Sequence, residues 1–306
     1  MVDSRLPVPP SGSALAPDAP LTLAIVGVGL IGGSFAQALR QAGCVRRVLG
    51  VGRQPASLQK AMDLGLIDEV VDAQVAAAQA DLVMLAVPVG AMRQMLKAMA
   101  PCLGEHTVLT DAGSTKTDVV QAARDVLGDR LGQFVPGHPV AGAETSGPQA
   151  ARASLYQGKQ IVLTPLAENP PAAVALVTRA WEACGASVRT MTALEHDQVL
   201  GSVSHLPHLL SAIYMAQVAS TDNAALRLDM AGSGFRDFTR IAAGSPEMWR
   251  DIVLSNAQIL RAELDAVRKL MDDVDDALSR GDGAALESLF DVAASARRTW
   301  QSSRET

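Results

Sequence analysis

The chain has 306 residues, 48% of them hydrophobic, enough for two domains that each bury a core. Its formal net charge is −6 and only 3% of its residues are aromatic, so we expect no nucleic-acid partner, since such surfaces are basic. No apolar run is long enough to cross a bilayer, so we expect no membrane partner. The cysteines, Cys44, Cys102 and Cys184, lie far apart and form no metal-ligand or redox pair, which favours the cytoplasm.

The first segment, residues 1–20, is rich in proline and lacks the apolar core of a signal peptide. We expect it to be a disordered tail. Strand and helix patterns then alternate over residues 21–191. Apolar runs predict strands over 21–29, 45–52, 67–72, 80–88, 106–114, 159–165 and 187–191, and the segment 133–139 predicts a further strand that leads into a loop. The intervening segments predict helices over 32–43, 55–65, 91–103, 117–128 and 172–185. This alternation predicts an α/β fold with a mostly parallel sheet and helices on both faces.

From residue 192 onward the helical period prevails, above all over 193–220 and 246–280. We therefore expect residues 192–306 to form an all-helical domain. Its helices are long and carry apolar stripes, and so few helices cannot easily bury those stripes among themselves. This predicts a homodimer formed through the helical domain.

The segment "GVGLIGGS" places Gly27, Gly29 and Gly32 in a G-x-G-x-x-G pattern between a predicted strand and a predicted helix. In a Rossmann-type domain the first glycine makes the tight turn, the second lets a pyrophosphate approach, and the third lets helix and strand pack closely. We therefore predict that residues 21–191 are a dinucleotide-binding domain; a glycine-rich turn without a ligand is the alternative. Further cofactor contacts are expected from Leu30, Ile31 and Val87.

The second predicted strand ends in Gly52 and Arg53, where an NAD site usually has an acidic residue that binds the ribose hydroxyls. Without a carboxylate a 2′-phosphate meets no like charge, and the guanidinium of Arg53 can bind it. We predict that NADP is preferred and that NAD is possible. Alternatively, Arg53 is a solvated loop residue and either cofactor serves.

Two further segments lie where ligands of an open α/β sheet bind. "TDAGSTK" (110–116) ends a predicted strand, so Ser114 or Lys116 is expected to face nicotinamide or substrate; Ser114 or Thr115 can also serve as a helix N-cap. In "PGHPVAGAE" (136–144), Pro139 excludes helical backbone at His138, which predicts a tight loop. These nine residues alone favour a solvated surface turn over a loop that aims an imidazole at a ligand.

The helical half offers two clusters. His205 and His208 in "SVSHLPHLLSA" share a helix face that starts or kinks near Pro207. No third metal ligand follows at a recognisable spacing, so we expect no metal. We favour the interpretation that the two histidines line an anion-binding pocket. The alternative, a hydrogen bond to neighbouring backbone only, is expected of His208 before His205. Residues 232–252 mix arginines with aromatic residues, which suggests carboxylate recognition. Surface pairing with Asp237 or Asp251 is instead expected of Arg236 and Arg250.

In this order, "GVGLIGGS", "TDAGSTK", "GHPVAGAE", "SHLPH" and "GFRDFTRIAAGSPEMW" resemble the motifs of the prephenate dehydrogenase family, which includes cyclohexadienyl and arogenate dehydrogenases of tyrosine biosynthesis. The resemblance covers residues 21–300, and its last two motifs are highly specific. The chain shows neither a chorismate mutase segment nor an ACT domain, so it resembles the form with a single activity.

The resemblance implies an oxidative decarboxylation in which hydride leaves C4 of a cyclohexadienyl ring for the nicotinamide and carbon dioxide is lost. Prephenate then gives 4-hydroxyphenylpyruvate, and arogenate gives tyrosine. By resemblance His138 takes the proton of the 4-hydroxyl, Ser114 lies near the nicotinamide and Arg240 binds a substrate carboxylate. The implied pocket wall consists of Ser204, His205, His208 and Trp249. Ala143 stands where many members have threonine, which removes one hydroxyl contact.

Two other functions share some of these features. A dehydrogenase of the β-hydroxyacid type has a glycine turn and a helical second domain, but it usually needs a catalytic lysine there, and Lys269 is far from "SHLPH" in sequence. A dinucleotide-sensing regulator would bind cofactor without turnover and would need neither His138 nor Arg240. Prephenate and arogenate both remain possible substrates.

Overall fold

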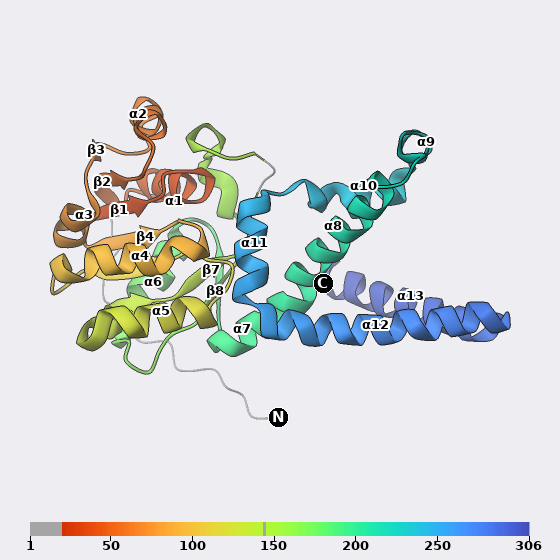
Figure 1. Ribbon diagram of the computed structural model, residues 1–306. Coiled ribbons are helices and arrows are strands. Elements are labelled where there is room, and N and C mark those ends of the chain that lie inside the picture. Colours follow the sequence, from red (N-terminus) through yellow and green to blue (C-terminus); the bar gives the residue numbers. More distant parts are fainter. Residues whose placement is uncertain (1–19, 143–144, 306) are drawn as a thin grey trace. The chain divides into compact units, whose positions relative to one another are not determined.

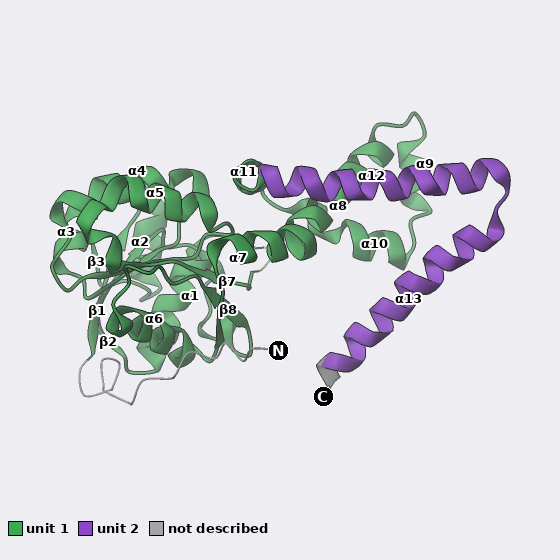
Figure 2. Ribbon diagram, turned by 90° about the horizontal axis from the view of Figure 1, so that it is seen from below, with its two compact units in different colours: residues 1–256 green, residues 257–306 purple. Residues whose placement is uncertain are grey.

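The computed structural model describes residues 20–142 and 145–305, with side chains to residue 303. The expected tail, apart from Pro20, and Ala143 lie outside the described residues. The chain forms two compact units, residues 1–256 and 257–306, which Figure 2 colours separately.

Six parallel strands form the central sheet of the first unit, in the order β3-β2-β1-β4-β5-β6 (Figure 1). This is the strand order of a doubly wound dinucleotide-binding fold. All strands are parallel, but the order in which they are added to the sheet switches from one side to the other between β1 and β4. The expected mostly parallel sheet is therefore confirmed. The strands are β1 (Leu21–Val26), β2 (Val45–Val51), β3 (Glu69–Val70), β4 (Leu82–Leu85), β5 (Val108–Asp111) and β6 (Phe134–Val135).

Helices cover both faces of this sheet and bury two separate cores. Leu23 and Ile25 of β1 face one core, whereas Ala24 and Val26 face the other, as the two-residue period of a strand requires. Burial on both faces explains why the strands have uninterrupted apolar sequences. The first core packs against α1 (Leu30–Gln41), α2 (Pro55–Asp63) and α6 (Pro171–Ala183). The second packs against α3 (Ala73–Gln79), α4 (Val89–Met99) and α5 (Thr117–Leu127).

The strands β7 (Gly137–Pro139), β8 (Gln160–Leu163) and β9 (Ser187–Thr190) form a second, three-stranded sheet. His138 therefore lies in a strand, opposite Val162 of antiparallel β8, and the expected tight loop is wrong. The physical reason is that Pro139 excludes helical backbone but allows extended backbone, and that β7 is an edge strand, where a residue without an N–H is tolerated. Short 3₁₀ turns lie at Ala100–Cys102, Gly128–Gln133, Pro148–Ala150 and Ala153–Tyr156.

The helical segment begins with α7 (Ala193–Leu200), whose start is fixed by a reciprocal capping box between Thr192 and Glu195. A π-helical turn, Gly201–His205, separates α7 from α8 (Leu206–Ala219). The expected start or kink of a helix near Pro207 is thus confirmed; Pro207 lies in the first turn of α8, where its missing N–H is tolerated. Further along the chain come α9 (Ala224–Asp229), α10 (Ser233–Thr239), a 3₁₀ turn at Arg240–Ala243 and α11 (Pro246–Ser255).

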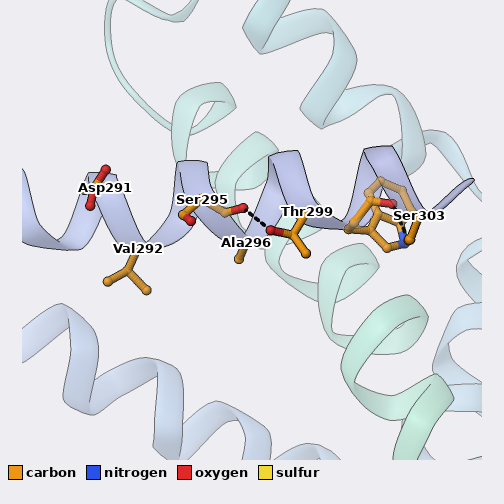
Figure 3. A pocket seen from close by; sticks show the side chains of 7 residues that line it. Asp291, Val292, Ser295, Ala296, Thr299 and Ser303 are labelled. Atoms are coloured by element: carbon orange, nitrogen blue, oxygen red, sulfur yellow. Dashed lines mark hydrogen bonds between the residues drawn. The ribbon is translucent and has the colours of Figure 1, made fainter. Parts of the chain in front are cut away.

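The second unit consists of α12 (Ala257–Arg280) and α13 (Gly283–Glu305), joined at Gly281, whose φ is +63°. The helical pattern expected over 246–280 is confirmed as two helices, α11 and α12, because the backbone leaves helical geometry at Asn256. Side chains of α13 such as Val292, Ala296 and Thr299, which Figure 3 shows as sticks, line a pocket. Among the described residues, no helix is both long and apolar enough to cross a membrane.

Candidate active site

The register of the central sheet brings three chain turns to one edge. Val26, Leu85 and Asp111 are the last residues of β1, β4 and β5, and they are aligned side by side. The glycine turn after β1, the turn after β4 and the "AGSTK" turn after β5 therefore share the carboxyl edge of the sheet, at its switch point. Ligands of open α/β sheets bind at this place.

The three glycines of the first turn differ in how much room a side chain would have at each position. Gly27 has a φ of +94°, and a Cβ there would lie 2.3 Å from the carbonyl oxygen of Ala86. A Cβ on Gly32 would lie 2.4 Å from the carbonyl oxygen of Gly27, so helix α1 can approach β1 only with glycine there. A Cβ on Gly29 would meet no protein atom within 4 Å. Packing thus requires Gly27 and Gly32, whereas Gly29 faces open space.

This turn fits the pyrophosphate of a dinucleotide. Gly29 caps α1 without any side-chain hydrogen bond, so the first turn of the helix presents backbone N–H groups to an anion. Leu30 and Ile31 are the first two residues of α1, so their backbone N–H groups have no partner within the helix, while the Ile31 carbonyl accepts the Tyr156 hydroxyl at 2.6 Å. Val87 is half-buried, and one of its methyl carbons lies 3.3 Å from the Cβ position of Gly27.

Arg53 lies two residues beyond the end of β2, and Val51 of β2 is aligned with Val26 of β1. The residue is exposed, as are Gly52 before it and Gln54 after it. The guanidinium is therefore placed near the edge at which β1 presents its glycine turn, and no acidic residue stands between them in the chain.

A buried ion pair holds the backbone directly before His138. The side chains of Lys116 and Asp111 are both fully buried and in contact. Asp111 accepts the Gly137 N–H at 2.9 Å, while the Lys116 ammonium donates to the Gly137 carbonyl at 2.6 Å. Lys116 therefore does not face nicotinamide or substrate, and that alternative is wrong; it clamps the β7 backbone instead. Losing either partner would leave an unpaired buried charge, which is strongly destabilising.

Asp197 caps helix α5 from a distant part of the chain. Its carboxylate accepts the backbone N–H groups of Lys116 and Thr117, each at 2.8 Å, across 81 and 80 residues of sequence. Helix α5 starts at Thr117 and has no side-chain cap of its own, so the expectation that Ser114 or Thr115 is its N-cap is wrong. A carboxylate here also interacts favourably with the helix dipole.

Hydrogen bonds connect the same carboxylate to His138 through a second histidine, His196. The Nδ1 atom of His196 lies 2.7 Å from Asp197, and its Nε2 atom lies 2.8 Å from Nδ1 of His138. His138 is only 9% exposed, so the solvated surface turn that its own segment favours is wrong. His196 and Asp197 are 0% and 1% exposed, which makes the three side chains one buried chain of hydrogen bonds.

The electrostatics of this chain favour a neutral imidazole at His138. Burial lowers its pKa well below the ordinary value, and repulsion from His196, Lys116 and His205 lowers the pKa further. Burial also lowers the pKa of His196, despite its hydrogen bond to Asp197. For Asp197 burial acts in the opposite direction, but hydrogen bonds from His196, Thr117 and Lys116 keep its pKa below the usual value. A neutral histidine beside an ionised carboxylate can accept a proton.

His205 is buried at the end of the π-helical turn, and its Nδ1 atom lies 3.1 Å from the amide nitrogen of Asn256. Asn256 also donates to the Asp197 carbonyl at 2.9 Å, and the Ser114 backbone faces His205. Burial lowers the pKa of His205 to about 4. Ser114 itself is half-buried in the turn after β5.

His208 donates from Nδ1 to the Ser204 carbonyl at 2.8 Å, which confirms the expected hydrogen bond to neighbouring backbone. Its ring stacks on Trp249 at 3.8 Å between centroids. Arg240 is exposed and close enough to His208 to lower its pKa, although burial is the larger cause.

The structure thus forms a His208–Trp249–Arg240 group and, nearby, a Ser114–His205–Asn256 group. His205 lies 6.3 Å from Trp249 between ring centroids, which connects the two. Arg250 pairs with Asp251 at 2.6 Å, as expected, whereas no ion pair joins Arg236 to Asp237 in the described residues. In the described part of the chain, no group of three or more His, Cys, Asp or Glu side chains is arranged so that it could hold a metal ion.

The sequence analysis missed His196, Asp197 and Asn256, and it missed the clamp formed by Asp111 and Lys116. A local signal for the first two exists: Thr192 and Glu195 match the capping-box pattern, which places His196 and Asp197 on the first turns of a helix. Asn256 and the clamp have no local signal, because their partners are distant in sequence.

A doubly wound sheet whose first strand ends in this glycine turn is typical of nicotinamide-dinucleotide-dependent dehydrogenases. The family model "Prephenate dehydrogenase, nucleotide-binding domain" matches residues 35–190, and "Prephenate dehydrogenase, dimerization domain" matches residues 192–292. The chain belongs to the prephenate dehydrogenase family.

Similar proteins agree with this assignment. The cyclohexadienyl dehydrogenase of Zymomonas mobilis is 38% identical over 280 residues, covering 90% of this chain and 94% of that protein. The prephenate dehydrogenase of Bacillus subtilis is 35% identical, covering 89% and 74%. The crystal structure of the Aquifex aeolicus prephenate dehydrogenase in complex with hydroxyphenyl propionate and NAD+ has a TM-score of 0.82 at 36% identity, covering 91% and 98%. The Synechocystis arogenate dehydrogenase has a TM-score of 0.77 at 29% identity, covering 91% and 99%.

Proposed function

We propose that this protein catalyses the oxidative decarboxylation of prephenate, arogenate or both, in tyrosine biosynthesis, with His138 as the base. The observation that carries the proposal is the buried His138 ring, whose Nδ1 is bound to His196 and whose pKa lies well below its ordinary value. Such a ring is neutral at working pH and keeps one nitrogen for the substrate hydroxyl.

The chemistry suits this arrangement. When bound, the nicotinamide accepts the hydride that leaves C4 of the substrate ring. His138 takes the proton of the 4-hydroxyl as C4 becomes carbonyl-like. When carbon dioxide leaves, the electron pair of the broken bond enters the ring, and His138 returns its proton to the oxygen of the new phenol. The imidazole acts first as base and then as acid, and it is regenerated without net proton release.

Residues around His138 supply the rest of the site in this proposal. Ser114 lies in the turn after β5, on the edge where nicotinamide binds, and contacts the cofactor and the hydroxyl. Arg240 offers a guanidinium for a substrate carboxylate, next to the stacked His208 and Trp249. Ser204 and His205 complete the wall of the pocket. Gly27, Gly29, Leu30, Ile31, Gly32 and Val87 form the cofactor side.

We also propose that NADP is preferred to NAD. Arg53 follows β2 in an exposed turn, at the position where an NAD site usually has a carboxylate. The guanidinium can bind a 2′-phosphate through its planar fork. The test is the ratio of kcat/KM for the two cofactors in the native protein and in Arg53→Gln. We expect NADP to be favoured in the native protein and the preference to weaken in the variant; a clear NAD preference in the native protein would contradict this.

A homodimer through the helical half is the oligomeric state that we propose. Helix α13 has no buried residue between 283 and 303, although it carries large apolar side chains. Exposed apolar residues of α12 and α13 are Leu270, Met271, Leu278, Leu289, Phe290, Val292 and Trp300. Sedimentation at micromolar concentration tests the proposal: a dimer supports it and a monomer refutes it.

Initial rates with prephenate and with arogenate, each crossed with NAD and NADP, test the reaction itself. We expect turnover with at least one of the four combinations. Turnover of a 3-hydroxy acid and of neither cyclohexadienyl substrate would instead identify a β-hydroxyacid dehydrogenase, and cofactor binding without any turnover would identify a sensing protein.

A further inference from the structure

We propose that Asp197 and His196 are positioning residues that fix the tautomer of His138, so that Nε2 of His138 is the nitrogen left free to accept a proton. The inference rests on the proposed role of His138 as the base. It assigns a task to two residues that contact neither substrate nor cofactor in the proposed reaction.

The hydrogen bonds of Asp197 to the backbone have only one possible direction. Two of its partners, the Lys116 and Thr117 backbone N–H groups at 2.8 Å, can only donate. One Asp197 oxygen bonds to Lys116 and to His196, and the other bonds to Thr117. Both oxygens therefore accept, which is what an ionised carboxylate does and a protonated one does less well.

The direction of this hydrogen bond then determines the direction of the next one, between the two histidine rings. Since Asp197 accepts at 2.7 Å, Nδ1 of His196 carries the proton. In a neutral ring the other nitrogen is an acceptor, so Nε2 of His196 accepts from Nδ1–H of His138 at 2.8 Å. His138 is then the Nδ1–H tautomer, and its Nε2 has a lone pair. With the opposite tautomer, Nε2 would carry a proton and could not act as base.

The surrounding charges favour this neutral arrangement. The groups that act on His138 are His196 of α7, His205 of the π-helical turn and Lys116 of the turn before α5, and each of them opposes a positive charge on its ring. His196 faces Asp197, Asp111 and Lys116. Because Asp111 is paired with Lys116, the carboxylate left to orient the histidine rings is Asp197. Its burial and its place at the N-terminus of α5 keep it fixed.

Asp197→Asn tests this direction while changing the shape of the side chain little. If the new amide nitrogen faces His196, the hydrogen bonds along the rings reverse and the proton of His138 moves to Nε2, while the same nitrogen opposes the Lys116 N–H. If it faces Thr117, it opposes the Thr117 N–H, and the amide oxygen still accepts from His196, so that the tautomer is kept. In the first orientation we expect kcat to fall by roughly 10–10³-fold with little change in KM. This is less than the roughly 10⁴-fold loss that the same change causes where the carboxylate contacts the catalytic histidine directly, because His196 stands between Asp197 and His138.

A pair of substitutions at His196 provides a test that does not depend on Asp197. The amide oxygen of Gln can take the place of Nε2 and still accept from His138, whereas Ala cannot. We expect His196→Gln to keep on the order of tenfold more kcat than His196→Ala, as a retained hydrogen bond to the base would give. Equal kcat values in the two variants would argue against a hydrogen-bonding role. Glu195→Gln, on the neighbouring residue of α7, is the matched control, because Gln also supports a capping box.

The direct readout is the tautomer itself, measured without substrate. Long-range ¹H–¹⁵N NMR of protein labelled at its five histidines distinguishes Nδ1–H from Nε2–H rings. His138→Asn identifies the His138 signals. We expect His138 to be the Nδ1–H tautomer in the native protein, and we expect any fall of kcat in Asp197→Asn to be accompanied by the loss of that state.

An Nε2–H tautomer in the native protein would overturn the inference, even if Asp197→Asn failed to fold. In a folded Asp197→Asn protein, a kcat that falls while the tautomer of His138 is unchanged would overturn it as well, because the loss of activity would then not follow the tautomer. Failure of the proposed function is a separate result, because it would appear as a native protein that turns over neither prephenate nor arogenate.

Discussion

The glycine turn after β1 and the histidine chain around His138 are the two parts of the proposed site, and they are built in opposite ways. The turn consists of backbone, and its residues lie within a few positions of each other. The histidine chain consists of side chains, and its hydrogen bonds join residues 58 to 81 positions apart, apart from the bond between neighbours His196 and Asp197. Cofactor binding therefore depends on where side chains are absent, and the chemistry depends on which side chains are present. Substitutions in the two regions should have different signatures.

The largest effect should come from His138→Asn. The Asn amide can keep the hydrogen bond that Nδ1 makes to His196, while the nitrogen that serves as base is lost. We expect kcat to fall by roughly 10²–10⁴-fold with little change in KM, in steady-state assays. His106→Asn, on an exposed histidine, is the control. An unchanged kcat in His138→Asn would remove this residue from the chemistry.

Arg240→Gln should act on substrate binding and less on the chemical step. The loss of a hydrogen bond to a charged group is worth about 1.5–3 kcal/mol, which corresponds to a KM raised by roughly 10–150-fold. Arg236→Gln, on an exposed arginine of the preceding helix, is the matched control and should leave KM unchanged. If KM is level in both variants, the substrate carboxylate binds elsewhere.

Two glycine substitutions test the turn by separating fold from binding. A Cβ on Gly32 collides with backbone, so Gly32→Ala should lower the free energy of unfolding by about 1–3 kcal/mol. A Cβ on Gly29 enters open space, so Gly29→Ala should leave stability nearly unchanged but raise the cofactor Kd, on the order of tenfold, by blocking the pyrophosphate. Denaturant titration and cofactor titration of both variants check this; a Gly29→Ala protein with the native Kd would place the pyrophosphate elsewhere.

The smallest effect concerns pH. The pKa values of His138, His196, His205 and His208 are lowered on folding, so the unfolded chain binds more protons below the ordinary histidine pKa of 6.5. The contribution of these histidines to the free energy of unfolding should therefore be constant above about pH 6.5 and fall as the pH drops below it. The slope is at most about 1.4 kcal/mol per histidine per pH unit. Denaturation between pH 5 and 7.5 measures the slope, which His138→Asn should reduce. A slope that is the same in the variant would show that His138 titrates normally.

These two regions also differ in how far the sequence predicts them. The glycine turn, the parallel sheet and the switch from strands to helices follow from local patterns, because their causes are local: chain reversal, burial on both faces and helical period. His138 is harder, since its own neighbours favour a solvated turn. Only its partners in β5, β8 and α7 bury it, and no local pattern contains them.

The positions at which helices end are also poorly predicted by local sequence patterns. Residues 246–280 have one continuous helical period, yet the helix ends at Ser255 and Asn256 donates to the Asp197 carbonyl and to His205 Nδ1. Likewise, Lys116 gives no sign in the sequence that its ammonium is buried against Asp111 and the Gly137 carbonyl. In both cases long-range polar contacts override the local pattern, and both lie beside the histidine chain.

The most direct test of the account is the ratio of carbon dioxide released to nicotinamide reduced, measured with whichever of prephenate and arogenate is turned over. Oxidative decarboxylation at His138 predicts one molecule of carbon dioxide per reduced nicotinamide, with both products lost together in His138→Asn. Reduced nicotinamide without carbon dioxide, or a ratio near one that survives at native rate in His138→Asn, would contradict it.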